Sequence, residues 1–183
     1  MKENDWWNEN LVKLNPALKH SFIEIADPDR KYELMQLEEI LTPERCHCML
    51  AGVSKKRILT NISELIAEDI ASLEADNIFN ALMAREQLGS TGLGNGIAIP
   101  HCRVPYCQDI IGTLVTLEEP INFDAIDGKP VDILFVLIVP EQKTDEHIKT
   151  LARLAELFNG EDFCYTLRHT HESKDLYNIA ITY

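Results

Sequence analysis

The sequence predicts an α/β protein, with a single three-layer α/β/α domain around a mixed central β-sheet. Residues 110–117 and 131–139 are continuous apolar runs rich in β-branched side chains, a pattern typical of strands covered on both faces. Segments with one apolar stripe at helical spacing lie before and after these runs. Helices that bracket buried strands pack on both faces of a sheet, which gives three layers.

The first elements follow from residue 35 onward. Ser54 is a suitable N-cap for a helix that runs to residue 71, and a second helix is expected from residue 73 or 75 to residue 87. Gly89 stands where a helix-ending glycine belongs. Cys46-His47-Cys48 is expected to form a short strand. The apolar stripes of the two helices are Ile58, Ile62, Leu65, Ile66 and Ile70, and Ile78, Phe79, Leu82 and Met83.

The second half of the chain holds the two buried strands and the remaining helices. Residues 123–128 read as a turn between the strands. Thr144 is expected to cap a helix over residues 145–158, whose inner stripe is Ile148, Leu151, Ala155 and Phe158. Residues 163–168 look like a turn or a strand, and residues 173–181 like a last helix.

Residues 1–34 differ from the rest of the chain. They show no sustained helical or strand period and contain several breakers, such as Asn15-Pro16 and Asp27-Pro28. We expect a partly ordered N-terminal arm or extension, followed by one domain over residues 35–183.

Charge and hydropathy exclude several classes of partner. The chain of 183 residues has 17 basic and 30 acidic residues and a net charge of -13, opposite in sign to a nucleic-acid binder. The longest apolar run, residues 133–139, is far shorter than the ~20 residues of a membrane span. The N-terminus shows no signal peptide, so we expect a cytoplasmic protein that binds neither nucleic acid nor membrane.

The five cysteines predict neither a disulfide framework nor a metal centre. Their number is odd and no export signal accompanies them, which favours free thiols. Cys46-His47-Cys48 resembles a fragment of a metal site, but no second Cys or His pair follows at a zinc-like spacing. We therefore expect no metal and no cofactor.

A glycine-rich loop, GSTGLGNG over residues 89–96, leads to Ile97-Ala98-Ile99-Pro100-His101. A Walker loop would need a lysine, which this loop lacks. A dinucleotide fingerprint follows a strand and opens a helix, whereas here a helix ends and a strand begins. We expect instead a loop that permits close backbone approach and delivers His101 to an edge of the sheet.

His101 is the best candidate for chemistry. Pro100 fixes its own φ and restricts Ile99, so the histidine is held in a defined direction at a surface. Backbone N–H groups of the loop, with the hydroxyls of Ser90 and Thr91, are possible donors to an anion. A neutral imidazole beside anion-binding groups is a nucleophile for a phosphoryl group, whereas a lone histidine after proline is more often structural.

Residues 84–101, AREQLGSTGLGNGIAIPH, resemble the signature of phosphotransferase-system (PTS) enzyme IIA domains of the fructose/mannitol type, above all the nitrogen-regulatory kind. The resemblance continues through residues 123–140, His147 and residues 151–155, and spans about residues 35–180. It implies that His101 accepts a phosphoryl group from an HPr-type phosphocarrier. It also implies that His147 is a second, supporting histidine and that Arg85 stabilises the phosphoryl group.

The physical character of these positions fits the resemblance. His147 lies in the first turn of its helix, where the helix dipole disfavours a charged imidazole. Arg85 offers bidentate geometry to phosphate, although a cation near a helix C-terminus is also favourable without any chemistry. One departure is Cys102, since the family usually has a small residue there. Nothing basic nearby in sequence is free to activate this thiol, so we expect it not to be catalytic.

The resemblance favours a phosphohistidine relay with regulatory output, in which the phosphorylation state controls partner proteins. The first alternative is a sugar-specific IIA that passes the phosphoryl group to a separate IIB of a fructose- or mannitol-type transporter. The second is a non-covalent binding module with the IIA fold. The presence of Arg85, His101 and His147 together argues against the second.

Overall fold

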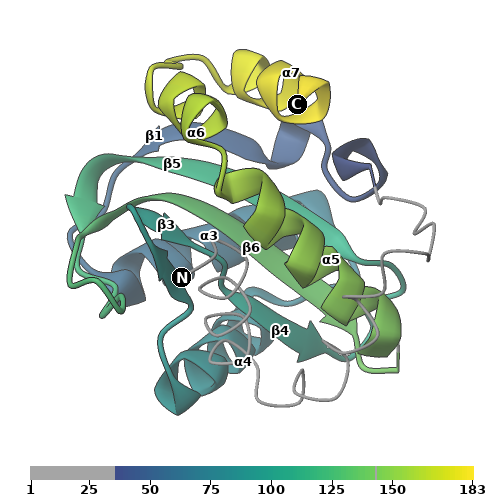
Figure 1. Cartoon of the computed structure of the whole chain (residues 1–183). Helices are drawn as coiled ribbons and strands as arrows, with labels where there is room; N and C mark the ends of the chain where they lie inside the picture. The colour runs from purple at the N-terminus through teal and green to yellow at the C-terminus, as the bar shows by residue number, and fades with distance from the viewer. Residues whose placement is uncertain (1–35, 143) are drawn as a thin grey trace, which may run out of the picture.

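The computed structural model describes residues 36–142 and 144–183, and a mixed six-stranded sheet organises them (Figure 1). The pairs β5–β6 and β2–β3 are antiparallel, while β1–β5, β3–β6 and β4–β6 are parallel. The predicted mixed sheet is thus confirmed. In order across the sheet, the strands are β1 (Cys46–Leu50), β5 (Ile111–Ile121), β6 (Val131–Pro140), β3 (Ile97–Ala98) and β2 (Gly92–Gly94), with β4 (His101–Val104) also on β6.

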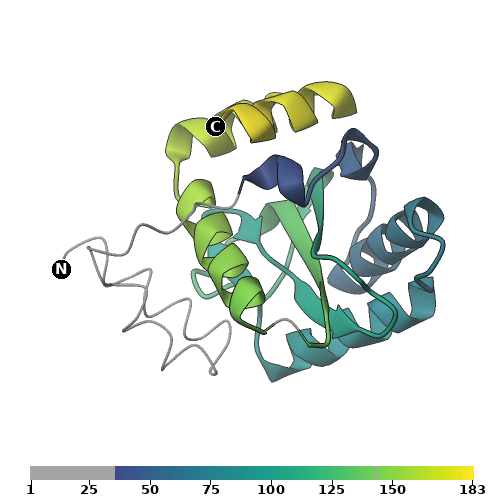
Figure 2. The ribbon, with the colours of Figure 1, turned by 90° about the vertical axis from the view of Figure 1, so that its right-hand side faces the viewer.

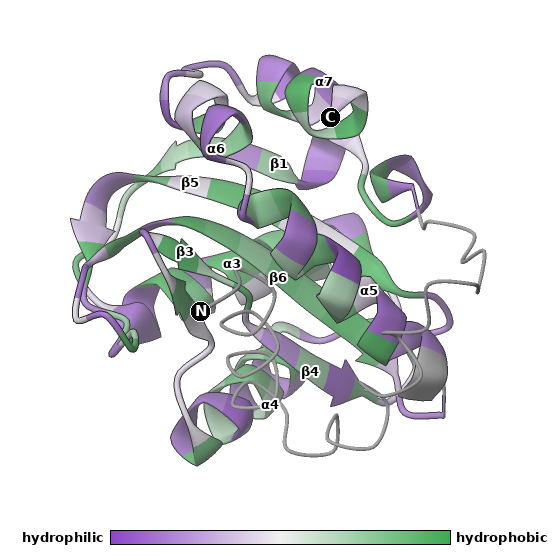
Figure 3. Ribbon diagram, in the orientation of Figure 1, coloured by the Kyte–Doolittle hydropathy of each residue, from purple (hydrophilic) through white to green (hydrophobic). Residues whose placement is uncertain are grey.

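Residues 111–117 of β5 and nearly all of β6 are buried, as their apolar runs predict, whereas residues 118–120 of β5 are exposed. Figure 3 shows β6 as a nearly continuous hydrophobic band. Its side chains alternate between two separate hydrophobic clusters, one on each face of the sheet. Ile133, Phe135, Leu137 and Val139 join the first cluster, and Leu134, Val136 and Ile138 join the second.

Helices cover both faces and complete the three layers (Figures 1 and 2). The second cluster packs under the helical pair α3 (Lys55–Asp69) and α4 (Ala75–Leu88). The first cluster packs under α5 (Thr144–Phe158), α6 (Glu161–Arg168) and α7 (Ser173–Thr182). Short 3-10 turns, η2 (Leu37–Glu39) and η3 (Pro43–Arg45), precede β1.

The predicted start of α3 and the glycine predicted to end α4 agree with the structure, whereas α3 ends at Asp69, two residues before the predicted end. The Ser54 side chain accepts a hydrogen bond from the Arg57 backbone N–H, 3.2 Å away, and α3 begins at the next residue. Gly89 ends α4 with φ 155°, a backbone conformation that favours glycine. All four residues of the predicted α5 stripe are buried. The predicted cap, Thr144, is instead the first residue of α5, one residue before the predicted start, and its side chain lies outside what the structure describes.

Two expectations need correction, and one falls outside the structure. Residues 163–168 are neither a turn nor a strand but most of α6, which buries Phe163, Cys164 and Leu167 on one helical face. Residues 92–94, predicted as part of a glycine-rich loop, form the short strand β2, which pairs antiparallel with β3 directly after the loop. The predicted arm at residues 1–34 lies outside the described residues.

Candidate functional site

His101 opens β4, whose only partner in the described sheet is β6, where it lies beside Leu137. The site therefore stands at an edge of the sheet, as predicted. Strand alternation turns Cys102 toward the α3–α4 layer, so His101 faces the α5 layer. The His101 Nδ1 atom lies 2.8 Å from the Ile99 carbonyl oxygen. Since a carbonyl only accepts, Nδ1 carries the proton and Nε2 carries the lone pair.

The expectation that His101 lies at a surface is wrong, because only 2% of the residue is exposed. Two side chains from different layers close over its ring. Arg85, in the last turn of α4, reaches round the β4 edge and donates its Nε–H to His101 Nε2 at 3.3 Å. His147, in the first turns of α5, stands with its ring centroid 5.5 Å from that of His101.

Buried nitrogen atoms of Arg85 and His147, the two side chains over the His101 ring, lack partners in the described structure. Arg85 Nη1 donates to the Gly89 carbonyl at 2.8 Å, but the buried Nη2 has no hydrogen-bond partner among the described residues. Both ring nitrogens of His147 are also buried and unpartnered in the described structure, with 3% of the residue exposed. Buried polar groups without a partner are costly, so this cluster is suited to a ligand that supplies acceptor oxygens.

Both imidazoles are held neutral. The pKa of His101 is lowered to about 3, chiefly by burial, with Arg85 and His147 acting in the same direction and the hydrogen bond to the Ile99 carbonyl opposing them. Burial also lowers the pKa of His147 to about 4, with Arg103 and Arg85 acting in the same direction. A neutral His101 keeps its Nε2 lone pair at physiological pH, as a nitrogen nucleophile requires.

Ser90 and Thr91 contact other groups than the histidines. The Ser90 hydroxyl donates to the Phe123 carbonyl at 2.6 Å and accepts from the Gly92 N–H at 3.1 Å. Thr91 is fully buried, and both its hydroxyl and its backbone N–H donate to the Glu86 carboxylate. Phosphoryl binding by these two hydroxyls stays a prediction, and it requires them to exchange their present partners.

The family model described as "Phosphoenolpyruvate-dependent sugar phosphotransferase system, EIIA 2" matches residues 39–181 of this chain. The chain belongs to this family. Membership in the EIIA 2 family implies a role in phosphotransfer. The match covers every element from β1 to α6, together with Arg85, His101 and His147, and almost all of α7.

Relatives and solved structures agree with this family. The nitrogen regulatory protein of Pseudomonas aeruginosa is 47% identical over 148 residues, which cover 81% of this chain and 96% of that protein. The crystal structure of IIA-Ntr from Neisseria meningitidis superposes with a TM-score of 0.74 at 37% identity, covering 79% of this chain and 98% of that one. The mannitol IIA of Escherichia coli, at 19% identity and a TM-score of 0.62, shares the fold.

Sequence reasoning missed two charged residues beside this EIIA 2 site. Lys55 Nζ lies 2.6 Å from the Glu86 carboxylate, whose side chain is 2% exposed. The ammonium also lies 4.5 Å from the Phe123 ring centroid. Lys55 and Glu86 are 31 positions apart, so no local pattern joins them. Their one sequence signal is that Glu86 follows Arg85 directly.

Other features of the protein stand apart from this chemistry. Burial raises the pKa of Cys102 to about 12, so its thiol stays protonated, in line with the expected lack of a catalytic role. Over the described residues, no group of three or more His, Cys, Asp or Glu side chains is arranged to hold a metal ion. None of the described helices has the length and apolar character of a membrane span.

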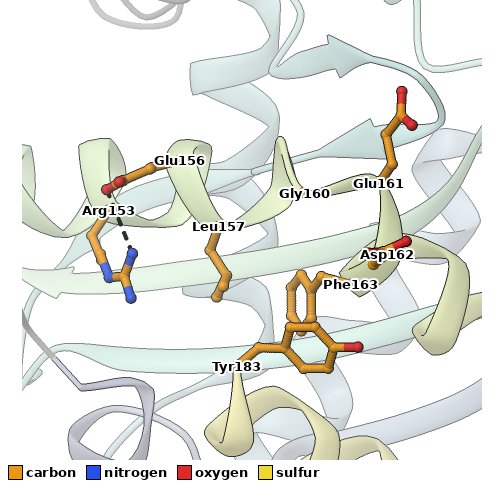
Figure 4. Close-up of a pocket in the computed structure, with 8 residues that line it drawn as sticks. All are labelled: Arg153, Glu156, Leu157, Gly160, Glu161, Asp162, Phe163 and Tyr183. Atoms are coloured by element: carbon orange, nitrogen blue, oxygen red, sulfur yellow. Dashed lines mark hydrogen bonds and ion pairs between the residues drawn. The ribbon is translucent and has the colours of Figure 1, made fainter.

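An open depression lies away from the histidines, between the end of α5, the start of α6 and the end of α7 (Figure 4). Phe163 and Tyr183 meet there with ring centroids 5.1 Å apart. Its ion pair, Arg153 with Glu156 at 3.5 Å, involves a largely exposed carboxylate and is worth little. None of the predicted site residues lines it.

Proposed function

We propose that this EIIA 2 protein is a cytoplasmic phosphohistidine relay, in which His101 accepts a phosphoryl group from an HPr-type phosphocarrier. One observation carries the proposal: His101 Nε2, which carries the lone pair, accepts from Arg85 Nε at 3.3 Å, and the His147 ring centroid lies 5.5 Å from that of His101, while Arg85 Nη2 and both ring nitrogens of His147 lack partners in the described structure. A phosphoryl group on Nε2 would bring three oxygens to these donors.

The transfer requires few atomic changes. Nε2 of His101 attacks the phosphorus of the carrier's phosphohistidine, and a new N–P bond forms as the old one breaks. The electron pair of the broken bond returns to the carrier's imidazole. The proton stays on Nδ1 during the attack, because its hydrogen bond to the Ile99 carbonyl at 2.8 Å holds the reactive tautomer in place.

Arg85 and His147 stabilise the added charge in this proposal. In this transfer the phosphoryl group adds about one net negative charge to the protein while Nδ1 keeps its proton, and about two once that proton is lost. Arg85 supplies a permanent positive charge with a free Nη2 donor. Neutral His147 has one N–H that can donate to a phosphoryl oxygen. The incoming oxygens would displace the 3.3 Å contact between Arg85 Nε and His101 Nε2.

A regulatory output is favoured over sugar transport. The supporting observation is the 47% identity to a nitrogen regulatory protein over nearly its whole length. The sugar alternative has support in the family description and in the fold shared with the mannitol IIA, which was solved in complex with phosphorylated IIB. In that case a fructose- or mannitol-type IIB would receive the phosphoryl group.

Labelling tests both parts of the proposal. The protein is incubated with labelled phosphoenolpyruvate, enzyme I and an HPr-type carrier, beside the variant His101→Ala. We expect label in the wild type and none in the folded variant. A purified fructose- or mannitol-type IIB is then added. Retention of the label supports the regulatory role, and rapid transfer to IIB establishes the sugar alternative.

A further inference from the structure

Glu86 is a buried carboxylate that three donor groups of other residues contact. It lies in the last turn of α4, directly after Arg85. Its side chain pairs with Lys55 Nζ at 2.6 Å and accepts hydrogen bonds from the Thr91 hydroxyl and, at 3.3 Å, from the Thr91 backbone N–H. Such a charge is retained in an interior only when its partners are in place.

One route leads from this carboxylate to His101. Glu86 fixes Thr91, and the Thr91 carbonyl accepts the Ile99 N–H at 3.0 Å. The Ile99 carbonyl in turn accepts the His101 Nδ1–H at 2.8 Å. The strand segment that selects the His101 tautomer is therefore attached to the carboxylate through a single residue.

A second route leads to Arg85. The Gly89 carbonyl that accepts from Arg85 Nη1 stands two residues before Thr91. Between them, Ser90 is fixed by its hydroxyl to the Phe123 carbonyl, which also accepts from Lys55 Nζ at 3.4 Å. The Lys55–Glu86 pair thus holds Thr91 directly and Ser90 through the Phe123 carbonyl, and these two residues follow the Gly89 carbonyl that aligns the guanidinium with Nε2.

The charge of the pair matters as well. An unneutralised Glu86 carboxylate beside Arg85 would attract the guanidinium away from the histidine. Lys55 neutralises it, and Arg85 directs its Nε–H to His101 and keeps Nη2 unpartnered among the described residues.

We propose that Glu86, held by Lys55, is a positioning residue that fixes the His101 tautomer and the Arg85 guanidinium for phosphoryl acceptance. The inference rests on the proposed function for its kinetic consequence. It assigns the Thr91 hydroxyl to Glu86 and not to the phosphoryl group. Glu86 itself touches neither the phosphoryl group nor the carrier.

The direct test is the variant Glu86→Gln. The amide keeps one acceptor oxygen, but its NH2 group faces the donor groups of Lys55 or Thr91 and cannot accept from them. The segment 89–91 therefore loses part of the hydrogen bonding that holds it. The matched control is Asp69→Asn, which breaks another partly buried ion pair, Arg45 with Asp69 at 2.9 Å, at the far end of α3.

Two measurements are compared in these variants. The ¹⁵N chemical shifts of the unphosphorylated His101 ring report its tautomer, and the rate of labelling by the phosphocarrier is measured against carrier concentration. In Glu86→Gln we expect a mixture of tautomers and a maximal rate lower by about tenfold to a hundredfold, because small misplacements of reacting groups have effects of this size. The carrier concentration at half-maximal rate stays within about twofold of wild type in Glu86→Gln. In Asp69→Asn the tautomer is that of wild type, and the labelling rate stays within about twofold.

If Glu86→Gln does not fold, the same measurements are made on Thr91→Val, which removes one donor to the carboxylate and conserves volume. It too is expected to shift the tautomer in the unphosphorylated protein. A wild-type tautomer and rate in the folded variants would overturn the role of Glu86. An unlabelled wild type would instead refute the proposed function, while the tautomer comparison still decides whether Glu86 positions the ring.

Discussion

Acid should destabilise this protein through its two buried histidines. The folded-state pKa values, about 3 for His101 and about 4 for His147, lie well below the ordinary value of 6.5. The unfolded chain therefore takes up more protons than the folded chain as the pH falls below 6.5. The free energy of unfolding is therefore highest above pH 6.5, where both imidazoles are neutral in the folded and unfolded chain. It decreases as the pH falls from 6.5 toward the folded-state pKa values.

The size of the effect follows from the linkage of proton binding to folding. Between about pH 7.5 and about pH 5 each histidine lowers the free energy of unfolding by about 2 kcal/mol, or about 4 kcal/mol together. This is a large share of the roughly 5–15 kcal/mol by which domains are stable. Urea unfolding at several pH values, followed by circular dichroism, measures it.

The double variant His101→Gln, His147→Gln removes this effect, so its stability should fall by about 4 kcal/mol less than that of wild type over the same range. Protonation of carboxylates contributes equally to both proteins and cancels in the comparison. His171→Gln, at an exposed position, is the control and should follow wild type. Equal losses in wild type and double variant would refute the neutral, buried state of the two rings.

Three further outcomes follow from the site. Arg85→Ala should slow labelling by about a hundredfold, as loss of one preorganised donor does elsewhere, and Arg85→Lys should recover only part because it lacks bidentate geometry. A wild-type rate in Arg85→Ala would leave Arg103 as the cation of the site. His147→Ala should still be labelled on His101 but pass the phosphoryl group on more slowly, and complete loss of labelling would make His147 the acceptor or part of one unit with His101. Deletion of residues 1–34 should leave the labelling rate unchanged, and a large loss would show that the arm completes the site.

The sequence was most informative where one element carries its own pattern. The apolar runs of β5 and β6 identify strands buried on both faces, because no amphipathic element is uninterrupted over such a length. Ser54 and Gly89 mark helix ends by local chemistry alone. The eight residues of α6 are too few for a period to be read, and their Phe163 and Tyr165 suited a strand equally well.

The sequence predicts which residues form the candidate site. It does not predict that His101 is buried or that the Lys55–Glu86 pair lies beside the site. The resemblance selects His101, His147 and Arg85, which the structure brings together. The burial of His101 depends on side chains from α4 and α5 closing over a sheet edge, which is a property of tertiary packing. The Lys55–Glu86 pair cannot be predicted from the sequence for the same reason, because only the contact between α3 and α4 brings the two residues together.

The central claim is that Nε2 of His101 accepts the phosphoryl group, and one measurement addresses it most directly. The protein is phosphorylated with phosphoenolpyruvate, enzyme I and an HPr-type carrier, and the modified residue is mapped by mass spectrometry and by ³¹P-coupled NMR of the imidazole ring. The account predicts phosphorus on Nε2 of His101, because Nδ1 is occupied by the Ile99 carbonyl. Phosphorus on Nδ1, on His147 or on any other residue would contradict it.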